Sequence, residues 1–292
     1  MPNHETAPFA IVDVFGERSL TGNPLAVVDL STGGYAVDDG WLAAVAREFN
    51  QAETTFVLPG TDTADRVLRS FTMGGVEVYG AGHNALGAWW WLLDSGRVTA
   101  PGRDLVQRIG PLDLAVEVQA DGWLAMRQRA PRFGSTGDAA VVAGALGLAA
   151  GDVRDTPAPR VVDTGAGHLM VLAAAREVLG RAAPDAGRLV AAAEAAGAEG
   201  VYLAWADPGA AVAHARFFNP GAGLPEDSAT GTAAGPLAAY LHDAGLAGAE
   251  LTVYQGEDMG RPSTLRVTLA DDGAPVLAGR GFTTMEGELR ID

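Results

Sequence analysis

Four polar side chains in the sequence stand in settings suited to acid–base chemistry. Glu53 opens the apolar run at 54–58 (TTFVL), and His83 opens an apolar segment that ends at Leu93. Desolvation raises the pKa of a carboxylate at the mouth of an apolar cleft, which suits a group that takes up and returns a proton. Asp227 and Glu77 are the remaining acidic candidates. These residue types predict a proton-transfer site.

Two glycines indicate how a ligand would be held. Gly82 and Gly231 precede predicted helices that begin at His83 and Thr232. Glycine lets the backbone approach a ligand closely, and the first N–H groups of a helix have no partner within it. Two such ends facing each other would form an anion site, since helix dipoles favour a carboxylate there. The sequence therefore predicts a small carboxylate ligand, bound between the two halves of the chain.

Each of these residues also has a purely structural explanation. An isolated Glu53 would be a solvated residue at a strand edge. Asp227 could cap or precede the following helix. His83 could be a core histidine whose hydrogen bonds are satisfied, and the glycines could serve helix–sheet packing. The pattern of single residues leaves both explanations open.

Composition excludes several classes of protein. With 36 acidic and 20 basic residues the formal charge is −16, which disfavours a phosphate backbone and predicts no nucleic-acid partner. Cysteine is absent, so thiol catalysis and disulfides are impossible. All the basic residues are arginine, and without lysine the chain can use neither a Schiff base nor a P-loop.

No metal or cofactor is expected. The five histidines, at 4, 83, 168, 214 and 242, show no spacing typical of metal ligands, and no GxGxxG follows the first predicted strand. The run Trp89–Trp91 lies in an apolar helix and is interpreted as core. Neither a signal peptide nor an apolar run of about 18 residues is present, so we expect a cytoplasmic protein without membrane contact.

Hydrophobic periodicity predicts short strands around one buried helix in each half. The helix at 38–49 has Asp38 as its N-cap and one apolar face, whereas the helix at 83–93 is apolar all round, as in a helix surrounded by protein. A matching helix is expected at 232–242, with Pro236 near its first turn. The predicted strands are 9–15, 25–28, 54–58, 67–72, 114–119, 201–205 and 212–218.

The two halves repeat short motifs in the same order, which favours a tandem duplication. Residues 69–72 (RSFT) resemble 216–219 (RFFN), and 81–85 (AGHNA) resemble 230–234 (TGTAA). The segment 52–57 (AETTFV) resembles 198–203 (AEGVYL), an alignment that pairs Glu53 with Glu199. We expect an N-terminal half at 1–130, a C-terminal half at 131–280, and a final strand within 281–292 that returns to the first half.

At these residues the sequence resembles the PhzF-like phenazine biosynthesis family. The segments that carry the resemblance run in family order over almost the whole chain: 12–15 (VDVF), 22–28 (GNPLAVV), 52–56 (AETTF), 69–83, 226–236 (EDSATGTAAGP) and 255–263. Departures stand at Ala52, Asn84, Asn219 and Thr232. Because these lie near the proposed pocket, they bear on substrate identity more than on the reaction class.

The resemblance implies an α+β, diaminopimelate-epimerase-like fold: two similar halves, each a curved mixed sheet wrapped around a central helix, often in a homodimer. It implies a cofactor-independent isomerase in which Glu53 matches the proton-shuttling glutamate. His83 and Asp227 match the assisting residues. The loop positions that match substrate contacts are Gly82, Asn84, Gly231 and Thr232.

Three functions are compatible with these features. The first is an isomerase that shifts a proton and a double bond in a small carboxylate, such as trans-2,3-dihydro-3-hydroxyanthranilate or another biosynthetic intermediate. The second is an epimerase or racemase that uses Glu53 and Asp227 as opposed bases. The third is a non-catalytic carboxylate-binding protein that keeps the fold.

Overall fold

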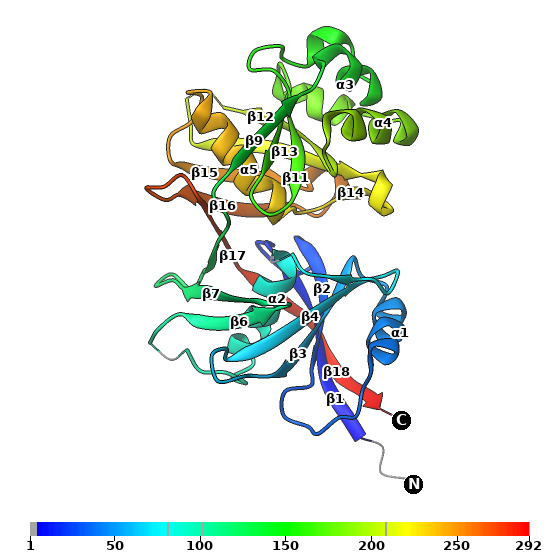
Figure 1. Ribbon diagram of the computed structural model, residues 1–292, viewed down its shortest axis with the longest axis vertical. Coiled ribbons are helices and arrows are strands. Elements are labelled where there is room, and N and C mark those ends of the chain that lie inside the picture. The colour runs from blue at the N-terminus through cyan, green and yellow to red at the C-terminus, as the bar shows by residue number, and fades with distance from the viewer. Residues whose placement is uncertain (1–4, 81, 101, 208, 292) are drawn as a thin grey trace. The chain divides into compact units, whose positions relative to one another are not determined.

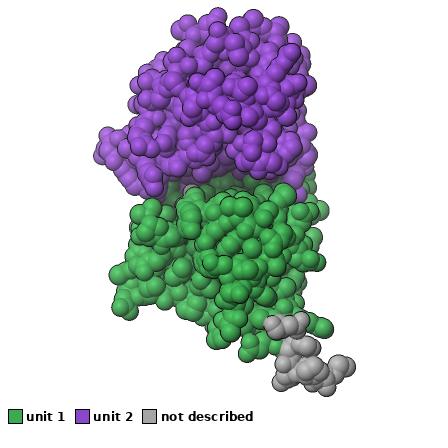
Figure 2. All heavy atoms as spheres, turned by 45° about the vertical axis from the view of Figure 1, so that its right-hand side comes forward, with its two compact units in different colours: residues 1–126, 279–292 green, residues 127–278 purple. Residues whose placement is uncertain are grey.

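The computed structural model describes residues 5–80, 82–100, 102–207 and 209–291, so Ala81 of the repeated segment at 81–85 lies outside the described residues. The chain divides into two compact units, coloured separately in Figure 2. The first unit comprises residues 1–126 and 279–292, and the second comprises residues 127–278. Each is described here by itself.

The first unit holds two helices, α1 (Asp39–Phe49) and α2 (His83–Asp94), among the described residues. Its strands are β1 (Glu5–Val14), β2 (Asn23–Asp29), β3 (Glu53–Pro59), β4 (Arg66–Thr72), β5 (Glu77–Val78), β6 (Leu105–Ile109), β7 (Leu112–Val118), β8 (Leu124–Arg127, which crosses the unit boundary by one residue) and β18 (Gly281–Ile291). The final strand β18 pairs antiparallel with β1 along its whole length.

The second unit holds three α-helices in the part of the chain that the structure describes: α3 (Ala139–Ala145), α4 (Ala186–Ala196) and α5 (Gly231–Asp243). Its strands are β9 (Arg132–Thr136), β10 (Arg160–Asp163), β11 (Gly167–Leu172), β12 (Gly200–Ala206), β13 (Val212–Asn219), β14 (Leu224–Asp227), β15 (Glu250–Gln255), β16 (Ser263–Leu269) and β17 (Pro275–Gly279, which crosses the unit boundary by one residue). Short 3₁₀ turns lie at 150–152, 176–181, 220–222 and 257–259.

Figure 1 shows the ribbon of each unit, and the strands of the two units pair in the same order. In the first, β1–β2 is antiparallel, β2–β3 parallel, β3–β4 antiparallel and β4–β6 parallel. In the second, β10–β11, β11–β12, β12–β13 and β13–β15 follow the same sequence of directions. The helices α2 and α5 occupy corresponding places, after β5 and β14. This repeated mixed topology confirms the predicted α+β fold of two similar halves.

The strand registers align the two units residue by residue. Arg69 lies opposite Phe56 and Arg216 lies opposite Leu203, and each arginine binds a glutamate, so both strands are related by an offset of 147, which places Val201 at the position of Thr54. Glu53 therefore corresponds to Gly200. The predicted match of Glu53 with Glu199 was wrong by one residue, because similar letters in an alanine- and glycine-rich chain do not fix the register.

The central helix of each unit is buried, as its all-round apolar sequence predicts. In α2, Trp89 and Trp91 are almost inaccessible, which confirms that they belong to the core, whereas the prediction was wrong for Trp90, which is only partly buried. The Trp89 Nε1–H donates to the buried Gln107 Oε1 at 2.9 Å, so its one polar atom has a partner. In α5, which begins one residue earlier than predicted, Pro236 is the sixth residue and lies just beyond the first turn. A buried helix tolerates this missing donor because packing rather than propensity stabilises it.

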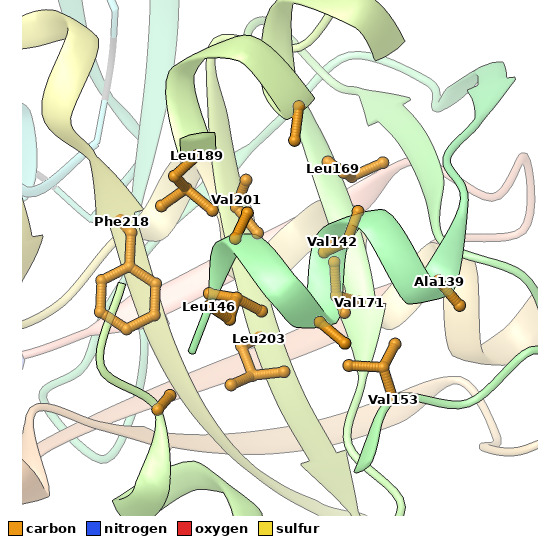
Figure 3. Close-up of a cluster of buried hydrophobic side chains, with 14 of the residues drawn as sticks. Ala139, Val142, Leu146, Val153, Leu169, Val171, Leu189, Val201, Leu203 and Phe218 are labelled. Carbon is orange, nitrogen blue, oxygen red and sulfur yellow. The ribbon is translucent and has the colours of Figure 1, made fainter. Parts of the chain in front are cut away.

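Peripheral helices cover the outer faces of the sheets. In the first unit α1 buries Leu42 and Val45 in a cluster that includes Phe56. In the second unit α3 and α4 cover β11 and β12, with Val142 and Leu189 in one shared cluster (Figure 3). Helices α3 and α4 are not predicted from the sequence, because their alanine-rich faces give weak periodicity. None of the helices described here is long and apolar enough to cross a membrane.

Two helical glycines test the packing of α2. A Cβ at Gly87 would lie 2.6 Å from methyl groups of both Leu25 and Val14, which are fully buried. A Cβ at Gly144 in α3 would meet nothing within 4 Å. We therefore expect Gly87→Ala to lower the free energy of unfolding by about 1–3 kcal/mol through overpacking.

The matched change Gly144→Ala should raise the free energy of unfolding by about 0.5–1 kcal/mol, because alanine is the better helix former. Urea denaturation of both variants measures the two effects. Equal changes in the two proteins would show that α2 is not packed against β1 and β2 as described.

Candidate active site

The backbone fixes the position of Glu53. Helix α1 ends at Asn50, whose left-handed conformation (φ 51°) turns the chain towards the sheet. Glu53 is then the first residue of β3 and lies opposite Thr72 of β4. Its side chain is half-buried, and Oε2 is shielded from solvent. The carboxylate thus stands at the end of a strand, on the margin of the apolar core.

The neighbouring Thr55 shows which face of β3 Glu53 occupies. The Thr55 hydroxyl lies 3.4 Å from the carbonyl oxygen of Asn84 in the first turn of α2, and 2.9 Å from Ser70 Oγ. Since side chains two residues apart lie on one face of a strand, about 7 Å apart along it, Glu53 is on the face that α2 covers. It is also at the strand end nearest to the N-terminus of that helix.

Asn84 anchors this N-terminus. Its Oδ1 accepts a hydrogen bond from the Gly82 N–H at 2.8 Å, and its Nδ2 donates to the Gly80 carbonyl at 2.8 Å and to Ser70 Oγ at 3.1 Å. Asn84 is 2% exposed, so these bonds form in a low-dielectric environment. The side chain therefore holds the turn in place, while the backbone N–H is the part of Asn84 suited to a ligand.

His83 is the first residue of α2. Its side chain is half-buried, and its Nε2 is buried without a hydrogen-bond partner among the described residues. Burial lowers the pKa of His83 to about 4, so the imidazole is neutral at physiological pH. A neutral imidazole can donate a hydrogen bond from one ring nitrogen and accept one at the other while it remains uncharged.

The central helices differ from the peripheral ones in how they begin. Asp38, Asp138 and Asp185 cap α1, α3 and α4, and each accepts hydrogen bonds from first-turn N–H groups. At α2 and α5 no described side chain caps the helix. Uncapped N–H groups together with the helix dipole are the elements of an anion site.

Gln255 holds the turn that leads into α5. Its Nε2 donates to the Asp227 carbonyl oxygen at 2.8 Å and to Thr230 Oγ1 at 3.0 Å, while its Oε1 accepts from the Thr230 N–H and from the Tyr202 hydroxyl. Gln255 is fully buried. The Thr230 hydroxyl in turn donates to Asp227 Oδ2 at 2.5 Å instead of capping the helix. The turn is thus fixed from within the protein.

The segment after Gln255 supports the same turn. Gly256 has φ +77°, and a Cβ there would lie 2.6 Å from the Ser228 carbonyl oxygen. The Ser263 hydroxyl donates to that same oxygen at 2.8 Å. The sequence segment at 255–263 therefore serves Asp227 and its neighbours structurally, which is a role that its residue types alone did not reveal.

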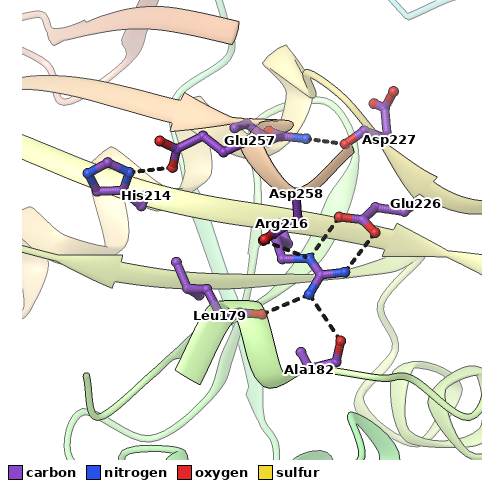
Figure 4. Close-up of polar contacts among 9 residues, drawn as sticks. Leu179, Ala182, His214, Arg216, Glu226, Asp227, Glu257 and Asp258 are labelled. Atoms are coloured by element: carbon purple, nitrogen blue, oxygen red, sulfur yellow. Dashed lines mark hydrogen bonds and ion pairs between the residues drawn. The ribbon is translucent and has the colours of Figure 1, made fainter. Parts of the chain in front are cut away.

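Two arginine–glutamate pairs occupy corresponding places in the units. Arg69 binds Glu77 through two hydrogen bonds of 2.7 Å, and Arg216 binds Glu226 through two of 2.8 Å. These bonds are the largest cause of the raised pKa of each arginine. Figure 4 shows Arg216 with Glu226 and the carboxylate of Asp227 directed away from them. Glu77, a candidate from sequence, is therefore occupied in an ion pair.

The predicted residues fall into one group in each unit. Glu53, Gly82, His83 and Asn84 gather at the start of α2. Asp227, Gly231 and Thr232 gather at the start of α5, where the buried His168 joins them. No group of three or more histidine or acidic side chains suited to a metal ion occurs among the residues described.

Comparisons with known proteins agree with this architecture. Solved structures with the same fold include a predicted epimerase from Pseudomonas aeruginosa, with a TM-score of 0.80, 35% identity and coverage of 98% of this chain and 100% of that one. A PhzF-family protein from Bacillus anthracis matches with a TM-score of 0.81 and 26% identity, over 98% of this chain and 100% of that one. The fold is therefore that of PhzF-type isomerases and epimerases.

The family model described as phenazine biosynthesis-like protein matches residues 12–287, and the chain belongs to this family of isomerases. A trans-2,3-dihydro-3-hydroxyanthranilate isomerase from Pseudomonas aeruginosa is 31% identical over 96% of this chain and 98% of its own length. An uncharacterized isomerase from Clostridium acetobutylicum is 28% identical over 96% and 97% of the two chains. The resemblance to the PhzF-like family is thus confirmed.

The buried histidines make stability depend on pH. Burial lowers the pKa of both His83 and His168 to about 4, so between pH 6.5 and 4 the unfolded chain binds protons that the folded chain does not. The free energy of unfolding should therefore fall as the pH drops through this window, by on the order of 1 kcal/mol per histidine at pH 5.5.

Denaturation in urea at pH 7.5 and at pH 5.5 measures this loss. The change His168→Leu should remove about half of it, whereas a change of the exposed His242 to Gln should leave the loss as in the unaltered protein. A pH dependence unaffected by His168→Leu would contradict the burial of a neutral imidazole at this position.

Proposed function

We propose that this enzyme shifts a proton and a double bond within a small unsaturated carboxylate, with Glu53 as the acid–base group and without a cofactor. The placement of Glu53 carries this proposal: a half-buried carboxylate lies on the face of β3 that α2 covers, beside the uncapped start of that helix. A relative that is 31% identical carries the name trans-2,3-dihydro-3-hydroxyanthranilate isomerase, which makes that compound the first substrate to test.

The reaction needs no net oxidation or reduction. The Glu53 carboxylate removes a proton from an sp³ carbon, and the electrons of the broken C–H bond move into the conjugated system and towards the substrate carboxylate. Protonated Glu53 then returns the proton to another carbon of that system, so the double bond has moved and Glu53 is a carboxylate again. Positioned acid–base catalysis of this kind typically contributes about 10²–10⁴ in rate.

The other groups are assigned from their surroundings. First-turn N–H groups of α5 bind the substrate carboxylate, where the helix dipole stabilises the growing negative charge. Neutral His83 orients the substrate or relays a proton beside Glu53. Asp227 accepts a hydrogen bond from the Thr230 hydroxyl, which fixes its carboxylate, and at α5 it likewise orients the substrate or relays a proton.

We expect Glu53→Gln to lower kcat by at least about 10²-fold with little change in KM, because glutamine keeps the shape of the side chain and cannot accept the proton. Stopped assays with trans-2,3-dihydro-3-hydroxyanthranilate measure this. The control is Glu199→Gln, which alters the exposed acid next to the residue that corresponds to Glu53. Turnover by Glu53→Gln equal to that of the control would remove Glu53 from the mechanism.

Isotope labelling distinguishes this mechanism from epimerisation by two opposed bases. One glutamate that removes and returns the same proton should retain part of a deuterium placed at the reacting carbon of the substrate, when turnover is followed in ordinary water. Two bases would exchange all of that label with solvent. Complete loss of deuterium, measured by mass spectrometry of the product at low conversion, would favour Glu53 and Asp227 acting as a pair.

A further inference from the structure

A buried histidine lies beside the start of α5. His168, in β11, is 3% exposed, and its Nε2 lies 3.3 Å from the hydroxyl oxygen of Thr232. The ring packs edge-on against Phe217, with 4.9 Å between the ring centroids. Gly200, opposite His168 on β12, leaves room for the Phe217 ring, since a Cβ there would lie 2.6 Å from a carbon of that ring. The imidazole is thus held in one orientation.

The duplication shows that the fold does not need a histidine here. Ala26 lies opposite Thr54, and Leu169 lies opposite Val201, so His168 corresponds to Leu25 of the first unit. Leu25 is fully buried beside the central helix α2. An apolar side chain therefore fills this position well, and burying a polar ring there costs free energy. A histidine at this position calls for a role other than packing.

Its hydrogen bonds indicate where the proton sits. Burial lowers the pKa of His168 to about 4, so the ring is neutral and carries one proton. Nδ1 is buried without a hydrogen-bond partner among the described residues. A proton on Nδ1 would leave a buried donor without an acceptor, which is rarer than an acceptor without a donor. A proton on Nε2 instead has Thr232 Oγ1 as its acceptor.

We propose that His168 is a positioning residue whose Nε2–H donates to Thr232 Oγ1 and thereby leaves the hydroxyl hydrogen of Thr232 to the substrate carboxylate. This rests on the carboxylate-binding role of α5 given above. With the opposite tautomer, the hydroxyl would donate to the imidazole and present only lone pairs to the ligand, which would repel a carboxylate. His168 thus sets the direction of the hydrogen bond at a residue that contacts the ligand.

A hydrogen bond to a charged group contributes about 1.5–3 kcal/mol, so loss of the oriented hydroxyl should weaken carboxylate binding by about 10-fold or more. Anthranilate serves as the probe because it is an aromatic amine that carries the carboxylate, and aniline is the matched compound without it. Calorimetry gives the Kd of anthranilate for each protein, and steady-state kinetics gives KM and kcat.

Three variants separate orientation from packing. His168→Leu installs the residue of the corresponding position and should weaken anthranilate binding and raise KM about 10-fold, with kcat within threefold and Tm not lowered. His168→Gln places an amide N–H near the position of Nε2. It should restore the Kd of anthranilate and the KM to within about threefold of the values of the unaltered enzyme. In a Thr232→Val background, His168→Leu should have no further effect on Kd.

The tautomer is measured independently by ¹⁵N NMR of the histidine side chains, and the proposal predicts a proton on Nε2 of His168. A proton on Nδ1, or unchanged anthranilate affinity in His168→Leu, would overturn this inference and leave the proposed reaction standing. If the unaltered enzyme bound anthranilate no more tightly than aniline, the carboxylate-binding role of α5 would fail, and the inference with it.

Discussion

The start of the central helix in each unit is the feature on which the rest of the site depends. Both α2 and α5 begin without a side-chain cap. The turn before each helix is instead held by a buried side-chain amide, that of Asn84 in the first unit and that of Gln255 in the second. These amides use their hydrogen bonds on the turn before the helix. The first-turn N–H groups stay available because the protein supports the turn from behind.

Duplication of one topology has produced two different kinds of surroundings for these helix ends. In the first unit a carboxylate and two hydroxyls line the strands, and in the second a glycine and two aromatic rings replace them. The corresponding pairs are Glu53 and Gly200, Thr55 and Tyr202, and Ser70 and Phe217. The first unit thus supplies the acid–base group, whereas the second supplies a rigid aromatic setting for His168 and Thr232.

The sequence predicts the parts of this arrangement that depend on local periodicity. The all-round apolar segment at 83–93 indicates a buried helix, and Glu53 at the start of an apolar run indicates the strand that carries it. Contacts between distant segments cannot be found in this way. Nothing in the letters around His168 places it beside Thr232, because that contact follows from the parallel register of β11 and β12. The strand register is also needed to show that Glu53 corresponds to Gly200 and not to Glu199.

The central claim is that uncapped peptide N–H groups of α5 bind the carboxylate, and ¹H–¹⁵N NMR during titration with anthranilate tests it most directly. The account predicts that the amide proton signals of Gly231 and Thr232 shift downfield and saturate at one ligand per chain, while aniline leaves them in place. Saturable binding of anthranilate that moves neither signal would contradict the claim.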